Sequence, residues 1–285
     1  MGVQLQNKML KKFTSWLMKE KPPEGLPLSD FDRLRFEIKP CDVLLIEGQS
    51  RVSDVIRLVT LSPWTHAMLY IGRLREIENP LLRAKLREAY HGDENDQLVI
   101  ESLLGKGTIV TSLSHYARAH IRICRPDGIS YGDRQKVIAY AINNIGLKYN
   151  IRQILDLARL LYPWSIMPRR WRSSLFTYNA GEPTHQICST MIAEAFSSVH
   201  FPILPVRKQT ADNEIELLQR NPKLITPRHF DYSPFFDIIK YPIYEISEKA
   251  LYRHLPWADG KVMINDDGTL VKPNKAEEDN SLGEE

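Results

Sequence analysis

The stretch Thr184-His185-Gln186-Ile187-Cys188-Ser189-Thr190-Met191-Ile192-Ala193-Glu194-Ala195-Phe196 predicts a helix with a cysteine in its first turn. Apolar residues recur along it at the spacing of a buried stripe, at Ile187, Met191, Ile192, Ala195 and Val199. A thiol at a helix N-terminus lies beside unpaired backbone N–H groups, which favour the thiolate. Two interpretations follow: Cys188 is a nucleophile, or it is a small buried hydrophobic residue, as most free cysteines are.

The composition is that of an ordinary globular protein, with 43% hydrophobic and 26% charged residues. The net charge of +3 and the lack of a long basic tract argue against a nucleic-acid partner. No apolar run approaches the ~18 residues of a membrane span. The three cysteines, Cys41, Cys124 and Cys188, are odd in number and widely spaced, and no apolar core of the length that secretion requires precedes them. We therefore expect free thiols and a cytoplasmic location.

The chain is expected to divide into four parts. Residues 1–27 form a basic amphipathic helix, at 7–20, and a Pro-rich linker. Such a helix can lie on an anionic membrane surface or dock on its own domain. The folded domain is predicted over 28–255, a terminal hairpin over 256–273 and a disordered acidic tail over 274–285.

Short apolar runs predict strands at 40–48, 65–72, 97–101, 107–111 and 120–126. No long crossover separates them, which favours a largely antiparallel sheet. Helices are predicted at 53–60 (with Ser53 as the cap), 79–90, 132–145, 151–162 and near 211–219. The fold class is therefore α+β.

A thiolate nucleophile needs a base to take its proton and a third group to hold that base. Most histidines here have polar or loop neighbours and are interpreted as surface or capping residues. His66 differs, because it lies on a predicted apolar strand, on the face that alternation gives to Met68 and Tyr70. The next strand ends at Glu101. If the two strands are neighbours, Glu101 can bond one ring nitrogen of His66 and leave the other to Cys188; a structural His–Glu pair is the alternative.

Several short motifs, taken in order, carry a resemblance to a known family. They are Pro40-Cys41-Asp42-Val43-Leu44-Leu45, Trp64-Thr65-His66-Ala67-Met68-Leu69-Tyr70-Ile71-Gly72, Val99-Ile100-Glu101-Ser102, Gly107-Thr108-Ile109-Val110, Arg125-Pro126, Gly146-Leu147-Lys148-Tyr149-Asn150, Ile187-Cys188-Ser189-Thr190, Leu224-Ile225-Thr226-Pro227 and Ser233-Pro234. With them the chain resembles the YiiX-like branch of the circularly permuted, papain-like NlpC-type superfamily, which is related to the lecithin retinol acyltransferase group. The resemblance covers about 36–240.

The resemblance implies a permuted papain-like α+β fold, with an antiparallel sheet packed against helices that include the one bearing the nucleophile. It implies that Cys188 is the nucleophile, His66 the base and Glu101 the orienting residue. It further implies that Trp64 and Tyr149 contact the substrate, and it implies no metal and no cofactor. Asn150 departs from the pattern, since the branch usually has Asp there.

The function that follows is a thiol-dependent hydrolase or acyltransferase, which forms an acyl-enzyme from an amide, ester or thioester. The substrate would be an acylated small molecule, a lipid or a peptide. The alternative is a catalytically idle module that binds lipid or a partner through residues 7–20 and the Trp- and Arg-rich segment 162–172. A third interpretation is a zinc site formed by His66, Glu101 and Cys188.

Overall fold

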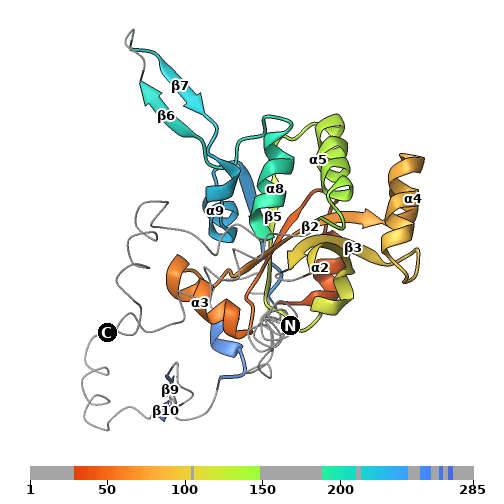
Figure 1. Ribbon diagram of the computed structural model, residues 1–285. Coiled ribbons are helices and arrows are strands. Elements are labelled where there is room, and N and C mark those ends of the chain that lie inside the picture. The colour runs from red at the N-terminus through yellow and green to blue at the C-terminus, as the bar shows by residue number, and fades with distance from the viewer. Residues whose placement is uncertain are drawn as a thin grey trace, which may run out of the picture. The chain divides into compact units, whose positions relative to one another are not determined.

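The computed structural model describes residues 29–103, 106–147, 188–209, 213–242, 251–257, 263–265 and 269–271. Its contacts divide the chain after Tyr241 into two units, and the predicted domain boundaries stay predictions. A six-stranded antiparallel sheet in the order β4-β3-β2-β1-β5-β8 forms the centre of the first unit (Figure 1). The strands are β1 (Val43–Ile46), β2 (His66–Arg73), β3 (Gln97–Leu103), β4 (Gly107–Ser112), β5 (Ile121–Pro126) and β8 (Phe236–Ile239). The five predicted strands are confirmed, whereas β8 was not predicted.

Each face of the sheet carries its own hydrophobic core, because successive residues of β2 point to opposite sides. Ala67, Leu69 and Ile71 pack with α4 (Pro80–Ala89), α5 (Tyr131–Asn143) and α8 (Cys188–Ser197). Met68 and Tyr70 pack with α2 (Phe31–Glu37) and with η2 (Leu113–Tyr116). In Figure 1, α5 and α8 lie side by side over the sheet. Helices and an antiparallel sheet in one unit confirm the α+β class.

Side-chain caps set where the helices begin. Asn79 Oδ1 accepts from the Leu81 amide at 2.9 Å, and Pro80 takes the first position of α4, as predicted. The predicted cap of α3 (Arg51–Thr60) is wrong by one turn. Ser50 caps this helix, since its Oγ accepts from the Ser53 amide at 3.2 Å, so that Ser53 lies inside the helix.

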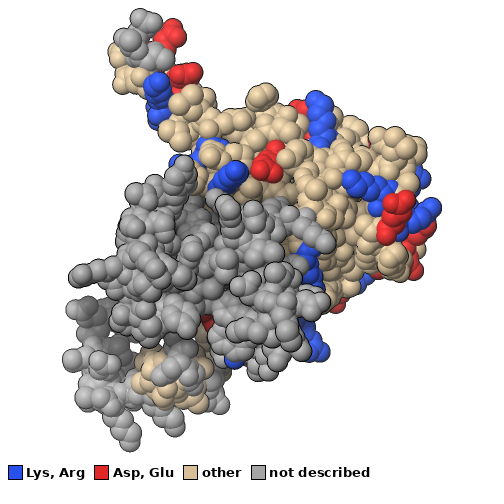
Figure 2. All heavy atoms as spheres, viewed as in Figure 1, with Lys and Arg blue, Asp and Glu red and all other residues tan. Residues whose placement is uncertain are grey.

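The helix predicted near 211–219 is also wrong. The described residues there form β7 (Ile215–Leu218), which pairs antiparallel with β6 (Val206–Gln209). The alternation in Glu214-Ile215-Glu216-Leu217 is a strand pattern, and cross-strand pairing decided the outcome. Both strands are exposed along their length, and the hairpin extends away from the sheet, with acidic and basic side chains on the face seen in Figure 2.

The second unit, Pro242–Glu285, contains η4 (Leu251–His254) and a small antiparallel pair, β9 (Met263–Ile264) and β10 (Leu270–Val271). These strands pair within the predicted terminal hairpin, with Ile264 opposite Leu270. In the part of the chain that the structure describes, no helix has the length and apolar character needed to cross a membrane.

Candidate active site

His66 and Glu101 lie next to each other on neighbouring strands. β2 and β3 pair with Met68 opposite Glu101, so His66, two residues before Met68, shares the face of Glu101. The His66 Nε2 and Glu101 Oε2 atoms are 2.6 Å apart. The sequence predicted this contact on the condition that the two strands are neighbours, and the sheet order meets that condition.

Glu101 is fully buried, and one of its oxygens accepts two hydrogen bonds. Besides His66, the Tyr116 hydroxyl donates to Oε2 at 2.6 Å. Burial raises the pKa of Glu101, but the hydrogen bond and charge of His66, together with side-chain hydrogen bonding from Tyr116 and Thr111, outweigh burial and hold this pKa below its usual value. An ionised carboxylate only accepts, so the hydrogen-bond network assigns the shared proton to His66 Nε2.

The first turn of α8 lies at the end of the sheet that carries His66. Ser189, the second residue of α8, donates from its Oγ to the Ile225 carbonyl at 2.6 Å. On α9 (Pro227–Tyr232), Arg228 donates to the Thr60 carbonyl at 3.1 Å, and Thr60 is the last residue of α3. Ile225 and Arg228 lie within three positions of each other, and Thr60 lies six positions before His66. These two contacts therefore place the start of α8 near the chain segment that leads into His66.

The other end of α8 lies at the opposite end of the sheet. Phe196 packs edge-on against Phe236, with ring centroids 5.3 Å apart. Phe236 pairs with Pro126, the last residue of β5, whereas the first residue of β5 pairs with Ile46, which also pairs with His66. α8 therefore runs away from His66, and its N-terminus is the end nearer to that histidine.

Cys188 is the first described residue of α8, and the sequence predicted this cysteine in the first turn of a helix. The placement of its side chain lies outside the described part of the structure. The buried side chains of α8 pack on the face of β2 that holds Ala67 and Leu69, while His66 begins the strand on the alternate face. A thiol at the start of α8 would therefore have to meet His66 around the rim of the sheet, and their pairing stays a prediction.

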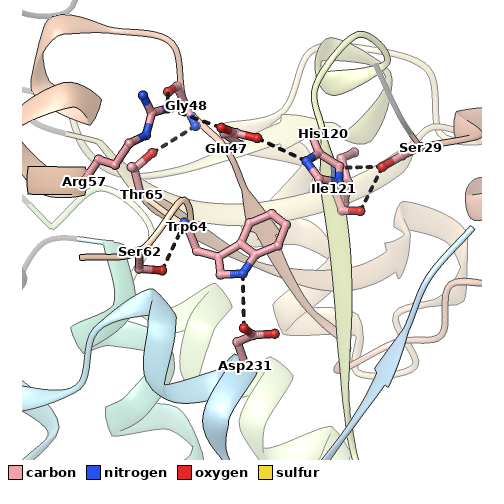
Figure 3. A network of polar contacts seen from close by, with 10 residues as sticks. All are labelled: Ser29, Glu47, Gly48, Arg57, Ser62, Trp64, Thr65, His120, Ile121 and Asp231. Carbon is pink, nitrogen blue, oxygen red and sulfur yellow. Dashed lines mark hydrogen bonds and ion pairs between the residues drawn. The ribbon is translucent and has the colours of Figure 1, made fainter. Parts of the chain in front are cut away.

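Trp64, predicted to bind substrate, is only 2% exposed. Its Nε1 donates to Asp231 Oδ2 at 3.2 Å (Figure 3), and the Arg122 guanidinium lies 4.6 Å from the centroid of the indole ring. Arg122 also forms an ion pair with Asp231. The described contacts of Trp64 are thus with the protein's own side chains, and its substrate role stays a prediction.

A polar group that the sequence analysis missed lies beside Trp64 (Figure 3). His120, whose ring centroid is 5.3 Å from that of Trp64, places Nδ1 3.1 Å from Glu47 Oε2. Arg57 lies 3.5 Å from Glu47 and donates to the Gly48 carbonyl. Glu47 follows β1 and His120 precedes β5, and these strands pair. A polar residue directly beyond each of two paired strand ends is the signal that would have found them.

Other predicted features lie outside the described residues. They are Tyr149 and Asn150, the helix at 151–162, and the segments 7–20 and 162–172. Their predicted roles in substrate binding and membrane contact stay predictions. Within the described ranges, no group of three or more His, Cys, Asp or Glu side chains could hold a metal ion.

The cap of α9 makes stability depend on pH. The Thr226 amide donates to His229 Nδ1 at 2.9 Å, and protonation of this nitrogen breaks the bond. Burial, with Arg220 and Arg228 adding to it, lowers the pKa of His229 to about 4. The unfolded chain therefore binds the proton first, and stability falls as the pH drops from about 6.5 to about 4.

We expect a loss of ~1–2 kcal/mol over this window, after discounting for the exposed part of the ring. Urea unfolding of the wild type and of His229→Gln at pH 7 and pH 4.5 measures it. The Gln amide oxygen can accept the same hydrogen bond but does not titrate, so the variant should lose less stability in acid. An equal loss in both chains would contradict the prediction.

Comparisons with known proteins bear on this site. The family model of the permuted papain-like amidase enzyme, YaeF/YiiX, C92 family, matches residues 37–160, which include His66 and Glu101 but end before Cys188. The structure of the metalloprotein yiiX from Escherichia coli O157:H7 aligns with a TM-score of 0.42 and 13% identity, covering 72% of this chain and 98% of that chain. No curated protein matches the sequence.

The family match confirms the predicted resemblance and, at the level of enzyme class, a cysteine hydrolase. It leaves the residues of the triad untested, because the match ends before the helix that carries Cys188. Residues 37–160, somewhat less than half of the chain, thus match the family of permuted papain-like amidases named YaeF/YiiX, C92.

Proposed function

We propose that this chain is a thiol-dependent hydrolase or acyltransferase in which Cys188 is the nucleophile, His66 the base and Glu101 the residue that orients the base. One observation carries the proposal: the 2.6 Å hydrogen bond between His66 Nε2 and a fully buried, ionised Glu101, at the end of the sheet nearer to the start of α8. An imidazole held by a buried carboxylate can activate a cysteine thiol that comes within reach of its other ring nitrogen.

The proposed chemistry has two steps. The Cys188 thiolate attacks the carbonyl carbon of an amide, ester or thioester, forming a C–S bond while backbone N–H groups at the start of α8 stabilise the oxyanion. Collapse breaks the bond to the leaving group, which takes its proton from His66. Water or an acceptor, giving up a proton to His66, then attacks the acyl-enzyme and releases the acid or the transferred acyl group.

The same pair explains which ring nitrogen would act. With Nε2 donating to Glu101, the lone pair of the neutral ring is on Nδ1, and this nitrogen would take the thiol proton. The substrate we propose is an acylated small molecule, a lipid or a peptide. Glu101 would keep the ring in one orientation and stabilise the imidazolium that forms.

Selective alkylation of Cys188 tests the nucleophile without knowledge of the substrate. Cys41 and Cys124 are fully buried; burial raises the pKa of the Cys41 thiol to about 12, and the pKa of the Cys124 thiol also lies well above its ordinary value because of burial. Iodoacetamide at pH 7 should therefore label Cys188 at least ~10²-fold faster than either of them, since the thiolate is the reactive form.

Peptide mass spectrometry after brief labelling measures the three rates, and the same treatment in denaturant is the control, where all three cysteines should react alike. His66→Ala should slow the labelling of Cys188 in the folded chain. Equal labelling of the three cysteines in the folded chain would remove the support for a special Cys188.

A further inference from the structure

Tyr116 contacts the same carboxylate as His66. Its hydroxyl donates to Glu101 Oε2 at 2.6 Å, the same oxygen and the same distance as for His66 Nε2. Among the described residues, the other oxygen of the carboxylate, Oε1, is buried and accepts no hydrogen bond. Both donors therefore act on one oxygen of a carboxyl group that has no contact with solvent.

The position of Tyr116 is fixed by the short helix that it ends. η2 follows β4 directly, and its start is capped by Ser112, whose Oγ accepts from the Ser114 amide. Leu113 anchors the helix in the core on the Met68 face, and the Tyr116 ring packs against that core. The Tyr116 carbonyl accepts from the Ala119 amide at 2.9 Å. Contacts before and after Tyr116 in the chain thus fix its backbone, and core packing fixes its ring. The hydroxyl is therefore in a position to set the orientation of Glu101.

We propose that Tyr116 is a positioning residue: its phenol holds Oε2 of Glu101 against His66 Nε2 and so keeps the imidazole proton on Nε2 and the lone pair on Nδ1. A carboxyl group with two equivalent oxygens can rotate about its last bond, and a donor on one oxygen removes that freedom. A phenol that donates to the carboxylate also favours the ionised form, which is the form that accepts from Nε2. The catalytic consequence of this arrangement rests on the proposed function, whereas the tautomer does not.

The tautomer can be measured directly by NMR. We would record long-range ¹H–¹⁵N correlations of the full chain carrying Cys188→Ala, so that no thiolate keeps the ring protonated, at a pH where His66 is neutral. His66→Ala in the same background assigns the signals. The expected spectrum has the proton on Nε2, and adding Tyr116→Phe should move both ring-nitrogen shifts toward those of a tautomer mixture. A proton on Nδ1, or unchanged shifts in Tyr116→Phe, would overturn the proposal.

Tyr70→Phe is the matched control. Tyr70 lies on the same face of the sheet and is buried, but its hydroxyl accepts from Gln97 Nε2 rather than donating to Glu101. This variant should leave the His66 shifts unchanged. If Tyr116→Phe fails to fold, the spectrum of the Cys188→Ala chain still tests the proposal. A proton on Nδ1 of His66 in that chain would contradict the proposed tautomer without any change at Tyr116.

Kinetics test the catalytic consequence. With a p-nitrophenyl ester as the acyl donor, Tyr116→Phe should lower kcat about tenfold and leave KM within about twofold, because Tyr116 acts through Glu101 and His66 and not on the substrate. A normal kcat with an altered tautomer would overturn the positioning role. A wild-type chain that turns over neither the ester nor a p-nitroanilide would instead count against the proposed function, and the NMR result for Tyr116 would stand independently.

Discussion

Cys188→Ala and His66→Ala are expected to abolish acyl-enzyme formation and to lower kcat/KM by at least about 10³-fold, because nucleophile and base act as a unit. Glu101→Gln should keep part of the rate, with a loss on the order of 10²-fold, since the imidazole remains but its orientation and charge stabilisation weaken. Rapid-quench mass spectrometry of the chain mixed with an activated ester measures the acyl-enzyme, and steady-state turnover measures kcat/KM.

His91→Ala is the matched control for the loss of an imidazole, because His91 is exposed in the loop between α4 and β3 and lies outside the His66–Glu101 contact. It should keep the wild-type rate. An acyl adduct that persists in Cys188→Ala, or full turnover in His66→Ala, would contradict the assignment of these two residues. Melting curves of each variant separate a loss of chemistry from a loss of fold.

The largest effect on stability is expected at the buried ion pair of Asp42 and Arg125. Arg125 Nε and a terminal guanidinium nitrogen donate to the two carboxylate oxygens of Asp42 at 2.9 and 2.8 Å. The Lys39 amide donates to the same carboxylate, whose side chain is 1% exposed. Burial raises the pKa of Asp42, against the lowering by Arg125 and by the Lys39 amide.

Arg125→Met should destabilise the fold by ~3–5 kcal/mol at pH 7, because it leaves a buried carboxylate without its cation. Asp42→Asn should cost less, roughly 1–3 kcal/mol, since the Arg125 side chain is 21% exposed and can turn to water. Urea unfolding at pH 7 gives both values. Equal costs for the two variants, or a cost below ~1 kcal/mol for Arg125→Met, would contradict this account.

The pH dependence of Arg125→Met sharpens the test. Without its cation, Asp42 should have a folded-state pKa above the unfolded value of about 3.9, so the folded state binds the proton more tightly. The stability linked to this group is then complete below about pH 4 and is lost as the pH rises through the folded pKa. The loss of stability caused by Arg125→Met should therefore be smaller in acid than at neutral pH. In an Asp42→Asn background, the same substitution should cause a loss that does not change between acid and neutral pH.

Local sequence signals predicted the elements that neighbours along the chain determine. The apolar runs around β1, β2, β3, β4 and β5 predicted those strands, and Asn79-Pro80 predicted the start of α4. Alternation along β2 predicted the face that His66 shares with Met68 and Tyr70. In each case the signal depends on residues within a few positions, through backbone sterics, capping bonds and side-chain direction.

The sequence analysis gave the wrong element, or none, in two places. Near 211–219 it predicted a helix, but the local alternation there is a strand pattern, and pairing with the preceding Val206–Gln209 makes the segment a strand. β8 was missed because four residues after a Pro-containing turn carry a weak pattern by themselves. Pairing with the edge of β5 turns that segment into a strand.

The sequence by itself determined the antiparallel strands and a helix that carries Cys188, and it predicted the His66–Glu101 pair on the condition that their strands are neighbours. Only the tertiary structure decided that α8 starts at the His66 end of the sheet, that Tyr116 joins Glu101, and that Trp64 is held by Asp231, 167 positions away in the chain. The physical reason is the separation of the partners along the chain. A hydrogen bond between such distant residues exists only after the sheet has formed and packed, and no spacing pattern within one segment encodes its partner.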